Sequence, residues 1–551
     1  MRITLFSAVL LATTSLPVGN RLQISTTTTH AEVKVPGNEV CAQCHSEIYK
    51  SYLATAMARA SGPALQGFVP GEFDDKVSGV RYRVFERDGR VWLSYARGTD
   101  LDGTREFLYF IGSGKKGRTY LFSDDRYLFE SPINWYSQEN RWNMTPAYTQ
   151  AREIPMNLPA SSSCLNCHTS GEQPYISGTT NRYAGKPFLH DGITCQRCHG
   201  SGEAHWSGAG AIVNPAKLPP ERRDAICMEC HFEGTTAVEQ RGKHIYEFRP
   251  GEQLSDYVHY FLLKDNLPQR EALSQYEALS LSTCKRKSGE RMWCGTCHDP
   301  HREPAEPEKA AYYRAKCLQC HTESFAAKHH SNKPDCIGCH MPSLPSKDVA
   351  HTESTDHRIL RYPATLSLQD ESAPRRTHLE AFPINAASMV ATRDMALAWE
   401  TLTERGVSGA DRNAEEFLRK ALKETPDDPR LLSSYALVEQ KHGKRTEARE
   451  LYQHALQLRP SANTAATNLG VLEARSGDLK DAVRLWQQAF DRVPYRSTIG
   501  MDLAIAFCAD SQKDEAKRYV ERVLEFNPDY AAARQMLARL NTDPGECKAK
   551  K

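Results

Sequence analysis

One pattern constrains this chain more than any other: the five residues Cys-x-x-Cys-His occur seven times between residues 41 and 340. The seven copies use fourteen of the seventeen cysteines. Their cysteines are Cys41 and Cys44, Cys164 and Cys167, Cys195 and Cys198, Cys227 and Cys230, Cys294 and Cys297, Cys317 and Cys320, and Cys336 and Cys339. The histidines that follow them are His45, His168, His199, His231, His298, His321 and His340. A spacing that never varies indicates one chemical task repeated seven times, not a set of disulfides.

The chemistry of covalent heme attachment accounts for this spacing. Two thiols three positions apart on a short turn reach the two vinyl groups along one porphyrin edge, and the adjacent histidine then ligates the iron. The pattern therefore predicts seven heme c groups, with the seven histidines as proximal iron ligands. Cysteine pairs at this spacing also build structural zinc sites, but zinc does not require a histidine beside the second cysteine in every copy.

The sixth position on each iron decides between two kinds of function. A filled position gives a low-spin electron carrier, whereas an open one binds and transforms a small molecule. Nine histidines lie outside the motifs between Cys41 and Arg361, enough for seven irons. His205 and His301 follow their own motifs too closely to cross the ring, so each is expected to ligate a neighbouring heme. The candidate distal ligands are Met57, His190, His205, His301, His330, His351 and His357.

Met57 is a candidate because no spare histidine lies near the first motif in the sequence. A thioether ligand at this position would raise the potential of the first heme relative to the others. The alternative is that Met57 only fills the core.

The residues around several motifs resemble a known family. These are Cys41-Ala-Gln-Cys44-His45-Ser-Glu-Ile-Tyr, Gly192-Ile-Thr-Cys195-Gln-Arg-Cys198-His199-Gly, Cys297-His298-Asp-Pro-His301 and Cys339-His340-Met-Pro. Over about residues 36–360 the chain resembles the multiheme family of the tetraheme electron carrier of ammonia oxidation, the cytochrome c-554 type with doubled Cys-x-x-Cys-His motifs. The resemblance implies a mostly helical, loop-rich heme domain that transfers electrons, and the family includes reductases. In that family the position of Met57 is often histidine. A Cys-x-x-Cys-Lys site, which pentaheme nitrite reductases use at their catalytic heme, does not occur.

The N-terminus predicts export. Arg2 is followed by an apolar run from Ile3 to Leu16 and then by a polar stretch to Ala31, the pattern of a signal peptide over residues 1–31 with Gly19 or Ala31 as its end. The run is too short to span a membrane, so we expect a periplasmic or secreted protein without an integral membrane segment after cleavage. The net charge of +2 gives no reason to expect nucleic acid as a partner.

Two further regions have patterns of their own. Apolar and polar residues nearly alternate on both sides of Asp88-Gly89, which predicts a hairpin within a small antiparallel β insertion at about residues 70–150. From residue 395 to 541, proline recurs every 34 positions at Pro426, Pro460, Pro494 and Pro528. This is the period of tetratricopeptide repeats, and it predicts four helical hairpins and a capping helix. Residues 361–394 are the expected linker and residues 542–551 a polar tail.

The predicted fold is therefore mainly α: a loop-rich multiheme cytochrome c domain over residues 36–360 with a β insertion, followed by an α-solenoid. The first functional hypothesis is an electron carrier between redox partner proteins, with a protein or peptide partner in the groove of the repeats. The second is a multiheme reductase or oxidase of a small nitrogen or sulfur compound at a five-coordinate heme. The third is a scaffold subunit of a redox complex. Of the remaining cysteines, Cys508 is expected in the core of the repeats and Cys547 in the tail, while Cys284 has no assigned role.

Overall fold

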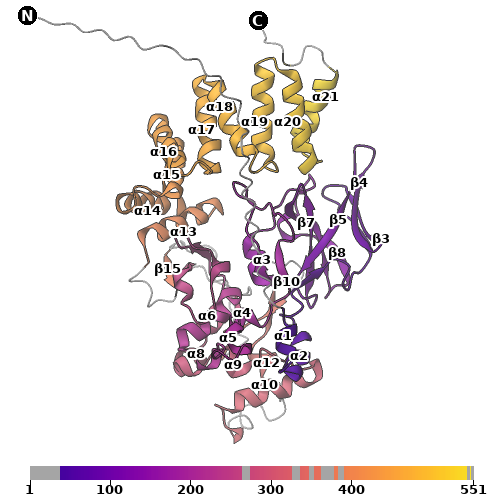
Figure 1. Ribbon diagram of the computed structural model, residues 1–551, viewed down its shortest axis with the longest axis vertical. Coiled ribbons are helices and arrows are strands. Elements are labelled where there is room, and N and C mark those ends of the chain that lie inside the picture. Colours follow the sequence, from indigo (N-terminus) through magenta and orange to yellow (C-terminus); the bar gives the residue numbers. More distant parts are fainter. Residues whose placement is uncertain are drawn as a thin grey trace, which may run out of the picture. The chain divides into compact units, whose positions relative to one another are not determined.

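The computed structural model describes residues 37–263, 273–324, 335–345, 353–361, 378–382, 390–542 and 547. The predicted signal peptide and the candidate ligands His330 and His351 lie outside these residues. Residues from Gly37 onward form one compact unit, in which the three expected regions are a β sheet, a loop-rich part and a helical array (Figure 1). Among the described residues, none of the helices combines the length and the apolar character needed to cross a membrane.

The β insertion is an antiparallel sheet in which β2 to β8 follow one another in sequence order and β1 pairs with β5. Its strands are β1 (Ser61–Pro63), β2 (Gly71–Asp74), β3 (Arg81–Arg87), β4 (Arg90–Arg97), β5 (Leu101–Ile111), β6 (Gly117–Asp124), β7 (Tyr127–Tyr136) and β8 (Arg141–Met144). The predicted hairpin is confirmed: Asp88 and Gly89 join β3 to β4 with φ of 55° and 71°, the two left-handed positions of a type I′ turn. Alternate residues of these strands, such as Tyr82, Val84 and Leu93, are buried in the core.

The loop-rich part consists mostly of short elements, and its Cys-x-x-Cys-His motifs lie in or beside helical turns. Its helices are α1 (Glu39–Ala42), α2 (Ser46–Leu53), α3 (Ser162–His168), α4 (Gln196–His199), α5 (Glu203–Trp206), α6 (Pro220–His231), α7 (Gln275–Leu281), α8 (Thr283–Ser288), α9 (Cys294–Cys297), α10 (Lys309–Leu318) and α12 (Cys336–His340). Single 3₁₀ turns lie at Pro146–Tyr148, Pro215–Lys217, Ile245–Glu247, Leu254–Asp256, Gly289–Arg291 and Glu306–Glu308.

Three small antiparallel sheets hold these turns together. They pair β9 (Thr169–Glu172) with β10 (Phe188–Asp191), β11 (Thr236–Glu239) with β12 (Val258–Leu263) and β15 (Leu379–Phe382), and β13 (Ser343–Pro345) with β14 (Glu353–Thr355). Strand β15 lies within the segment predicted as a linker. It reads Leu-Glu-Ala-Phe, in which Leu379 and Ala381 are buried and the alternate residues are not. This period of two suits an edge strand, and it was too short to be recognised in the sequence.

The helical array has the predicted repeat. Its helices are α13 (Thr392–Glu404), α14 (Ala410–Glu424), α15 (Pro429–Lys441), α16 (Arg445–Leu458), α17 (Asn463–Ser476), α18 (Leu479–Phe490), α19 (Ser497–Ala509), α20 (Lys513–Phe526) and α21 (Ala531–Thr542). One alanine in each repeat is almost fully buried where paired helices meet: Ala414, Ala448, Ala482 and Ala516. One residue between the paired helices has positive φ: Gly409, Gly443, Gly477 and Ser511. Glycine recurs there because it adopts this conformation without steric cost.

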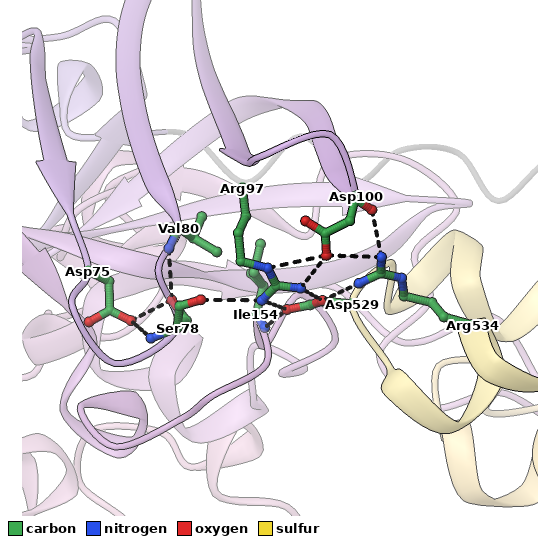
Figure 2. Close-up of polar contacts among 8 residues, drawn as sticks. All are labelled: Asp75, Ser78, Val80, Arg97, Asp100, Ile154, Asp529 and Arg534. Carbon is green, nitrogen blue, oxygen red and sulfur yellow. Dashed lines mark hydrogen bonds and ion pairs between the residues drawn. The ribbon is translucent and has the colours of Figure 1, made fainter.

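The last repeats contact the β insertion through a buried carboxylate (Figure 2). Asp529, 2% exposed, lies in the turn between α20 and α21. It accepts hydrogen bonds from Arg97 Nη1 at 3.0 Å, from Arg534 Nη1 at 3.0 Å and from the backbone N–H of Ile154 at 3.0 Å. Arg534 also pairs with Asp100 of the insertion at 3.0 Å. Asp529 therefore joins the insertion, the segment that follows it and the final helix.

Aromatic rings pack beside this carboxylate. Tyr127 and Phe129 of β7 meet Tyr495 and Phe526 of the array, with ring centroids 5.4–5.9 Å apart and mostly edge-to-face. Such pairs add to the free energy of plain apolar burial. The insertion and the last repeats thus share one hydrophobic core.

The first repeat is joined to the heme-binding part in a similar way. Asp394 of α13, 1% exposed, accepts from His259 Nδ1 of β12 at 2.9 Å and from Gln240 Nε2 at 2.7 Å. Arg241 donates to the backbone carbonyl of Asp427 at 3.1 Å, in the turn after α14.

A disulfide joins Cys508 of α19 to Cys547 beyond the last helix. Cys508 packs against the core of the repeats, as expected, and the disulfide is a further feature that the sequence analysis did not predict. Nothing in the sequence indicates the bond, because Cys547 lies in a polar tail, 39 residues away.

Candidate functional site

The Cys-x-x-Cys-His motifs lie in or beside helical turns, which place their two thiols and their imidazole together. In four of them the backbone N–H of the histidine donates to the carbonyl of the first cysteine at 2.9–3.0 Å: His45 to Cys41, His199 to Cys195, His298 to Cys294, and His321 to Cys317. An i to i+4 bond of this kind brings positions i, i+3 and i+4 to one face. Both thiols and the imidazole of a motif are thus presented to the same side.

Hydrogen bonds determine which ring nitrogen remains for a metal. Nδ1 of His199 lies 2.8 Å from the carbonyl of Val213, and Nδ1 of His340 lies 2.6 Å from the carbonyl of Leu360. A carbonyl accepts only from a protonated nitrogen, so Nε2 is left as the unprotonated ligand. The donor set therefore fits an iron bound through Nε2.

The electrostatics also suit ligation, which needs neutral imidazoles. Burial lowers the pKa of His298 to about 4. Burial is also the largest cause of the lowered pKa values of His168, His231, His301 and His357. These rings are held in the form that offers a lone pair to a metal.

Three motif histidines lie opposite histidines from outside the motifs, with nearly parallel rings. The ring centroids are 6.4 Å apart in the pair of His45 and His205, with 14° between the planes. They are 5.8 Å and 12° apart for His199 and His301, and 6.2 Å and 29° apart for His298 and His357. An iron about 2 Å from the facing nitrogen of each ring needs a centroid separation of roughly 6 Å. All three pairs have the spacing that one iron between them would require.

The other candidate ligands lie elsewhere. His190 is in β10, where it pairs with Ser170 just beyond the second motif. Met57 lies in the turn after α2, where its carbonyl accepts from the backbone of Ile193, and the imidazole that lies opposite His45 is that of His205. His244, which is not a candidate, has Nδ1 3.0 Å from Glu239.

Neighbouring motifs are in contact through their cysteines. Four pairs of thiols interact closely enough for each pair to shift a thiol pKa: Cys41 with Cys195, Cys167 with Cys230, Cys227 with Cys294, and Cys317 with Cys336. The first motif thus adjoins the third, the fourth adjoins both the second and the fifth, and the sixth adjoins the seventh. Groups attached at these thiols would be neighbours in space.

Sequence reasoning did not find the side chains that surround the motifs. Tyr313 Oη lies 3.3 Å from His298 Nδ1, and Gln275 Oε1 lies 3.4 Å from His231 Nδ1. Burial raises the pKa of Glu229, inside the fourth motif, to about 7, although Arg197 of the third motif opposes this shift. The sequence contains one indication of the contact between Arg197 and Glu229: the residue before the second cysteine is charged in both of their motifs, with opposite signs.

Comparisons with protein families match four segments of the chain. Residues 134–200 match the model described as cytochrome c554 and c-prime, and residues 286–326 match the doubled CXXCH motif. Residues 435–497 and 473–540 match tetratricopeptide repeat models. A search of curated proteins gives no match.

Solved structures that are similar include MamA from Desulfovibrio magneticus RS-1, at 19% identity over 27% of this chain and 84% of that one, with a TM-score of 0.24. PilF of Pseudomonas aeruginosa is 22% identical over 27% and 69% of the two chains, with a TM-score of 0.25. A tetratricopeptide repeat protein from Parabacteroides merdae is 19% identical over 27% and 59%, with a TM-score of 0.24.

Proposed function

Since the chain is a multiheme c-type cytochrome fused to C-terminal tetratricopeptide repeats, we propose that it transfers electrons between redox partner proteins through seven covalently bound hemes. Each bound heme supplies a one-electron iron couple. The chain supplies two thiols and a proximal imidazole at each of the seven motifs, and it holds neighbouring motifs in contact.

The observation that carries this proposal is the set of three facing imidazole pairs, His45 with His205, His199 with His301, and His298 with His357. An iron held on both sides by histidine is low-spin and offers no open position to a substrate. This arrangement suits an electron carrier better than a reaction site. The thiol contacts between motifs support it further, because electrons pass between neighbouring groups.

The test is made on the purified full-length protein. Its intact mass under denaturing conditions gives the number of covalent hemes, for which we expect seven. Its ferric electron paramagnetic resonance spectrum is expected to contain mainly low-spin signals. A mass that corresponds to no covalent heme would overturn the proposal. A strong high-spin signal that binds nitrite, hydroxylamine or sulfite would favour the alternative, a reductase or oxidase with a five-coordinate heme.

The distal ligand of the first heme has its own test, because His205 and Met57 are competing candidates. We expect His205→Ala to convert one heme to the high-spin form, since the imidazole opposite His45 is removed. Met57→Ala is expected to leave the spin state unchanged. The reverse result would assign Met57 as the ligand.

The repeats are proposed to bind a protein partner. An open pocket of about 480 Å³ lies on α15 and α16, lined by Tyr435, Glu439, Lys444, Glu447, Glu450, Leu451 and His454. We expect Glu447→Lys with Glu450→Lys to weaken capture of a redox partner while heme content stays unchanged. Undiminished capture would favour the third hypothesis, a scaffold subunit in which the repeats support the heme-binding part. The buried contacts of Asp529 and Asp394 would then be the means of that support.

Export to the periplasm or beyond is part of the proposal. It is supported by the apolar N-terminal run and by the disulfide between Cys508 and Cys547, a bond that persists in oxidising compartments. Fractionation of the source cells tests it, with the mature N-terminus read by mass spectrometry. An uncleaved protein in the cytoplasmic fraction would contradict it.

A further inference from the structure

The residue directly before the second cysteine is polar in six of the seven motifs, and in three consecutive motifs it takes part in one cluster. These three residues are Asn166 in the second motif, Arg197 in the third and Glu229 in the fourth. They lie on α3, α4 and α6, separated in sequence by 31 and 32 residues. Heme attachment places no demand on this position, so its occupants are free to serve another purpose.

In the structure these three residues contact one another, and we call them the inter-motif bridge. Arg197 Nη2 donates to the backbone carbonyl of Asn166 at 3.0 Å and to its Oδ1 at 3.1 Å. The same guanidinium donates to the carboxylate of Glu229. Asn166 and Glu229 are 2% and 4% exposed, and the side chain of Arg197 is 14% exposed. The bridge is thus a buried ion pair with an amide beside it.

The bridge lies among the thiols that attach three hemes. Cys167 Sγ is 3.9 Å from the backbone carbonyl of Glu229, and Cys167 and Cys230 are themselves in contact. Arg197 Nε is also buried and has no acceptor among the described residues, so the bridge keeps one donor for a bound group.

A buried ion pair is a poor way to gain stability, because desolvation offsets most of the attraction between its charges. Its electrostatic effect on neighbours is strong, because a charge in a low-dielectric interior acts over longer distances than one in water. An exposed pair would be screened by solvent. Both facts point to an effect on the nearby hemes.

We propose that the inter-motif bridge sets the reduction potentials of the hemes at the second, third and fourth motifs as one coupled group, with Glu229 lowering them and Arg197 raising them. This inference rests on the proposed electron-transfer function and adds positioning residues to it. Reduction adds an electron to the iron, so a nearby carboxylate disfavours the reduced state and a nearby guanidinium favours it. The balance of the two charges then sets the potential of this group relative to the other hemes.

The test compares charge variants of the full-length holoprotein by spectropotentiometric titration, at a pH well above 7 so that the buried carboxyl of Glu229 is ionised. We expect Glu229→Gln to raise the midpoint potential of at least one and at most three of the titrating hemes, and Arg197→Gln to lower them. The double variant is expected to return close to the wild-type values, because both charges are removed together. A purely structural role would not produce opposite shifts that cancel.

Asn166→Asp gives a second, nearly isosteric test, which remains available if the other variants do not mature with heme. It adds a carboxylate within reach of Arg197 and is expected to lower the same potentials. The control is Asp74→Asn, which breaks the exposed pair of Asp74 with Arg81 in the β insertion and should move no potential. Unchanged potentials in folded, heme-loaded bridge variants, or an equal shift of every heme, would overturn the inference. Absence of covalent heme in the wild type would instead overturn the proposed function.

Discussion

A single histidine can supply the second ligand of an iron, and we expect His301 to do so. It lies opposite His199, with ring centroids 5.8 Å apart, although it belongs to the segment that follows a different motif. We expect His301→Met to raise one midpoint potential, because a thioether ligand favours ferrous iron more than imidazole does. Spectropotentiometric titration measures the shift. His244→Met, at an exposed histidine beside Glu239, is the matched control, and the same shift in both variants would refute the assignment.

The stability of the junction between the heme-binding part and the first repeat depends on pH through the carboxyl of Asp394. Burial alone would raise its pKa, but hydrogen bonds from His259, Gln240 and Arg393 hold the pKa below its usual value. A carboxyl with a depressed folded pKa stabilises the protein fully above its unfolded pKa of about 3.9. That stability is lost as the pH falls further, through the folded value.

Replacement of this carboxylate is therefore expected to matter at neutral pH. Asp394→Asn should lower the free energy of unfolding by about 2–4 kcal/mol at pH 7, because it removes the buried acceptor of His259 and one of the two buried carboxylates that pair with Arg393. The difference from the wild type should shrink as the pH falls below about 4 and through the lowered pKa of the folded carboxyl, where the wild-type side chain also becomes neutral. Chemical denaturation followed by circular dichroism measures both. An equal difference at pH 3 and pH 7 would contradict this account.

At the residue scale, the sequence predicts the attachment sites and names candidate distal ligands, but it does not pair each candidate with a motif histidine. The motif fixes the geometry of its own turn through local hydrogen bonds, so its residues were predictable. His45 and His205 are 160 positions apart, and nothing local relates them. Met57 was nearest to the first motif in sequence, yet the fold brings His205 opposite His45.

Among the elements, the turns between paired helices of the repeats show how backbone conformation selects a residue type. Gly443 and Gly477 have φ of 82° and 94°, and Ser511 holds the corresponding position at 61°. A side chain in this region costs about 1 kcal/mol relative to glycine. We expect Ser511→Gly to raise the free energy of unfolding by about 0.5–1 kcal/mol and Gly477→Ala to lower it by a similar amount. Urea denaturation measures both, and a destabilised Ser511→Gly variant would contradict the argument.

The disulfide between Cys508 and Cys547 closes a loop that contains the last helix of the array, α21. A bond that closes a loop of 39 residues removes much of the freedom of the unfolded chain, worth about 3–4 kcal/mol. We expect reduction, or Cys508→Ser with Cys547→Ser, to lower the thermal midpoint of the repeats. Hydrogen exchange should localise the loss to α21 and its neighbours. Equal exchange in the oxidised and reduced proteins would show that the bond adds no stability.

The repeats were the most predictable elements, because Pro426 and its counterparts every 34 residues set the helix ends independently of the rest of the fold. Strand β15 was not predictable, since its four residues form a strand only by pairing with β12.

The whole molecule depends on contacts between segments that are far apart in sequence. Asp529 and Arg97 are 432 residues apart, and their contact fixes the last repeats on the β insertion. No sequence pattern indicated this junction, because an aspartate in a turn and an arginine at a strand end are ordinary surface residues on their own.

We expect Asp529→Asn to lower the free energy of unfolding by about 2–3 kcal/mol, because it removes the buried carboxylate that Arg97 and Arg534 share and leaves them only the half-exposed Asp100. Glu416→Gln, in the exposed pair of Glu416 with Lys420, should have a much smaller effect, because solvent screens that pair. Thermal unfolding of the holoprotein compares the two. Equal effects would mean that the buried junction is no stronger than a surface pair.

The turns between successive repeats carry a consequence for how this chain can change in evolution or in the laboratory. Solenoids usually gain and lose whole repeats with little penalty, because each unit contacts only its neighbours. Here Asp427, Tyr495 and Asp529 in three of those turns are each joined to a different point of the preceding chain, through Arg241, Asn157 and Arg97. Duplication or deletion of one 34-residue unit would move the later turns out of register with their partners. The number of repeats is therefore fixed by the rest of the molecule, and this array lacks the modularity of its class.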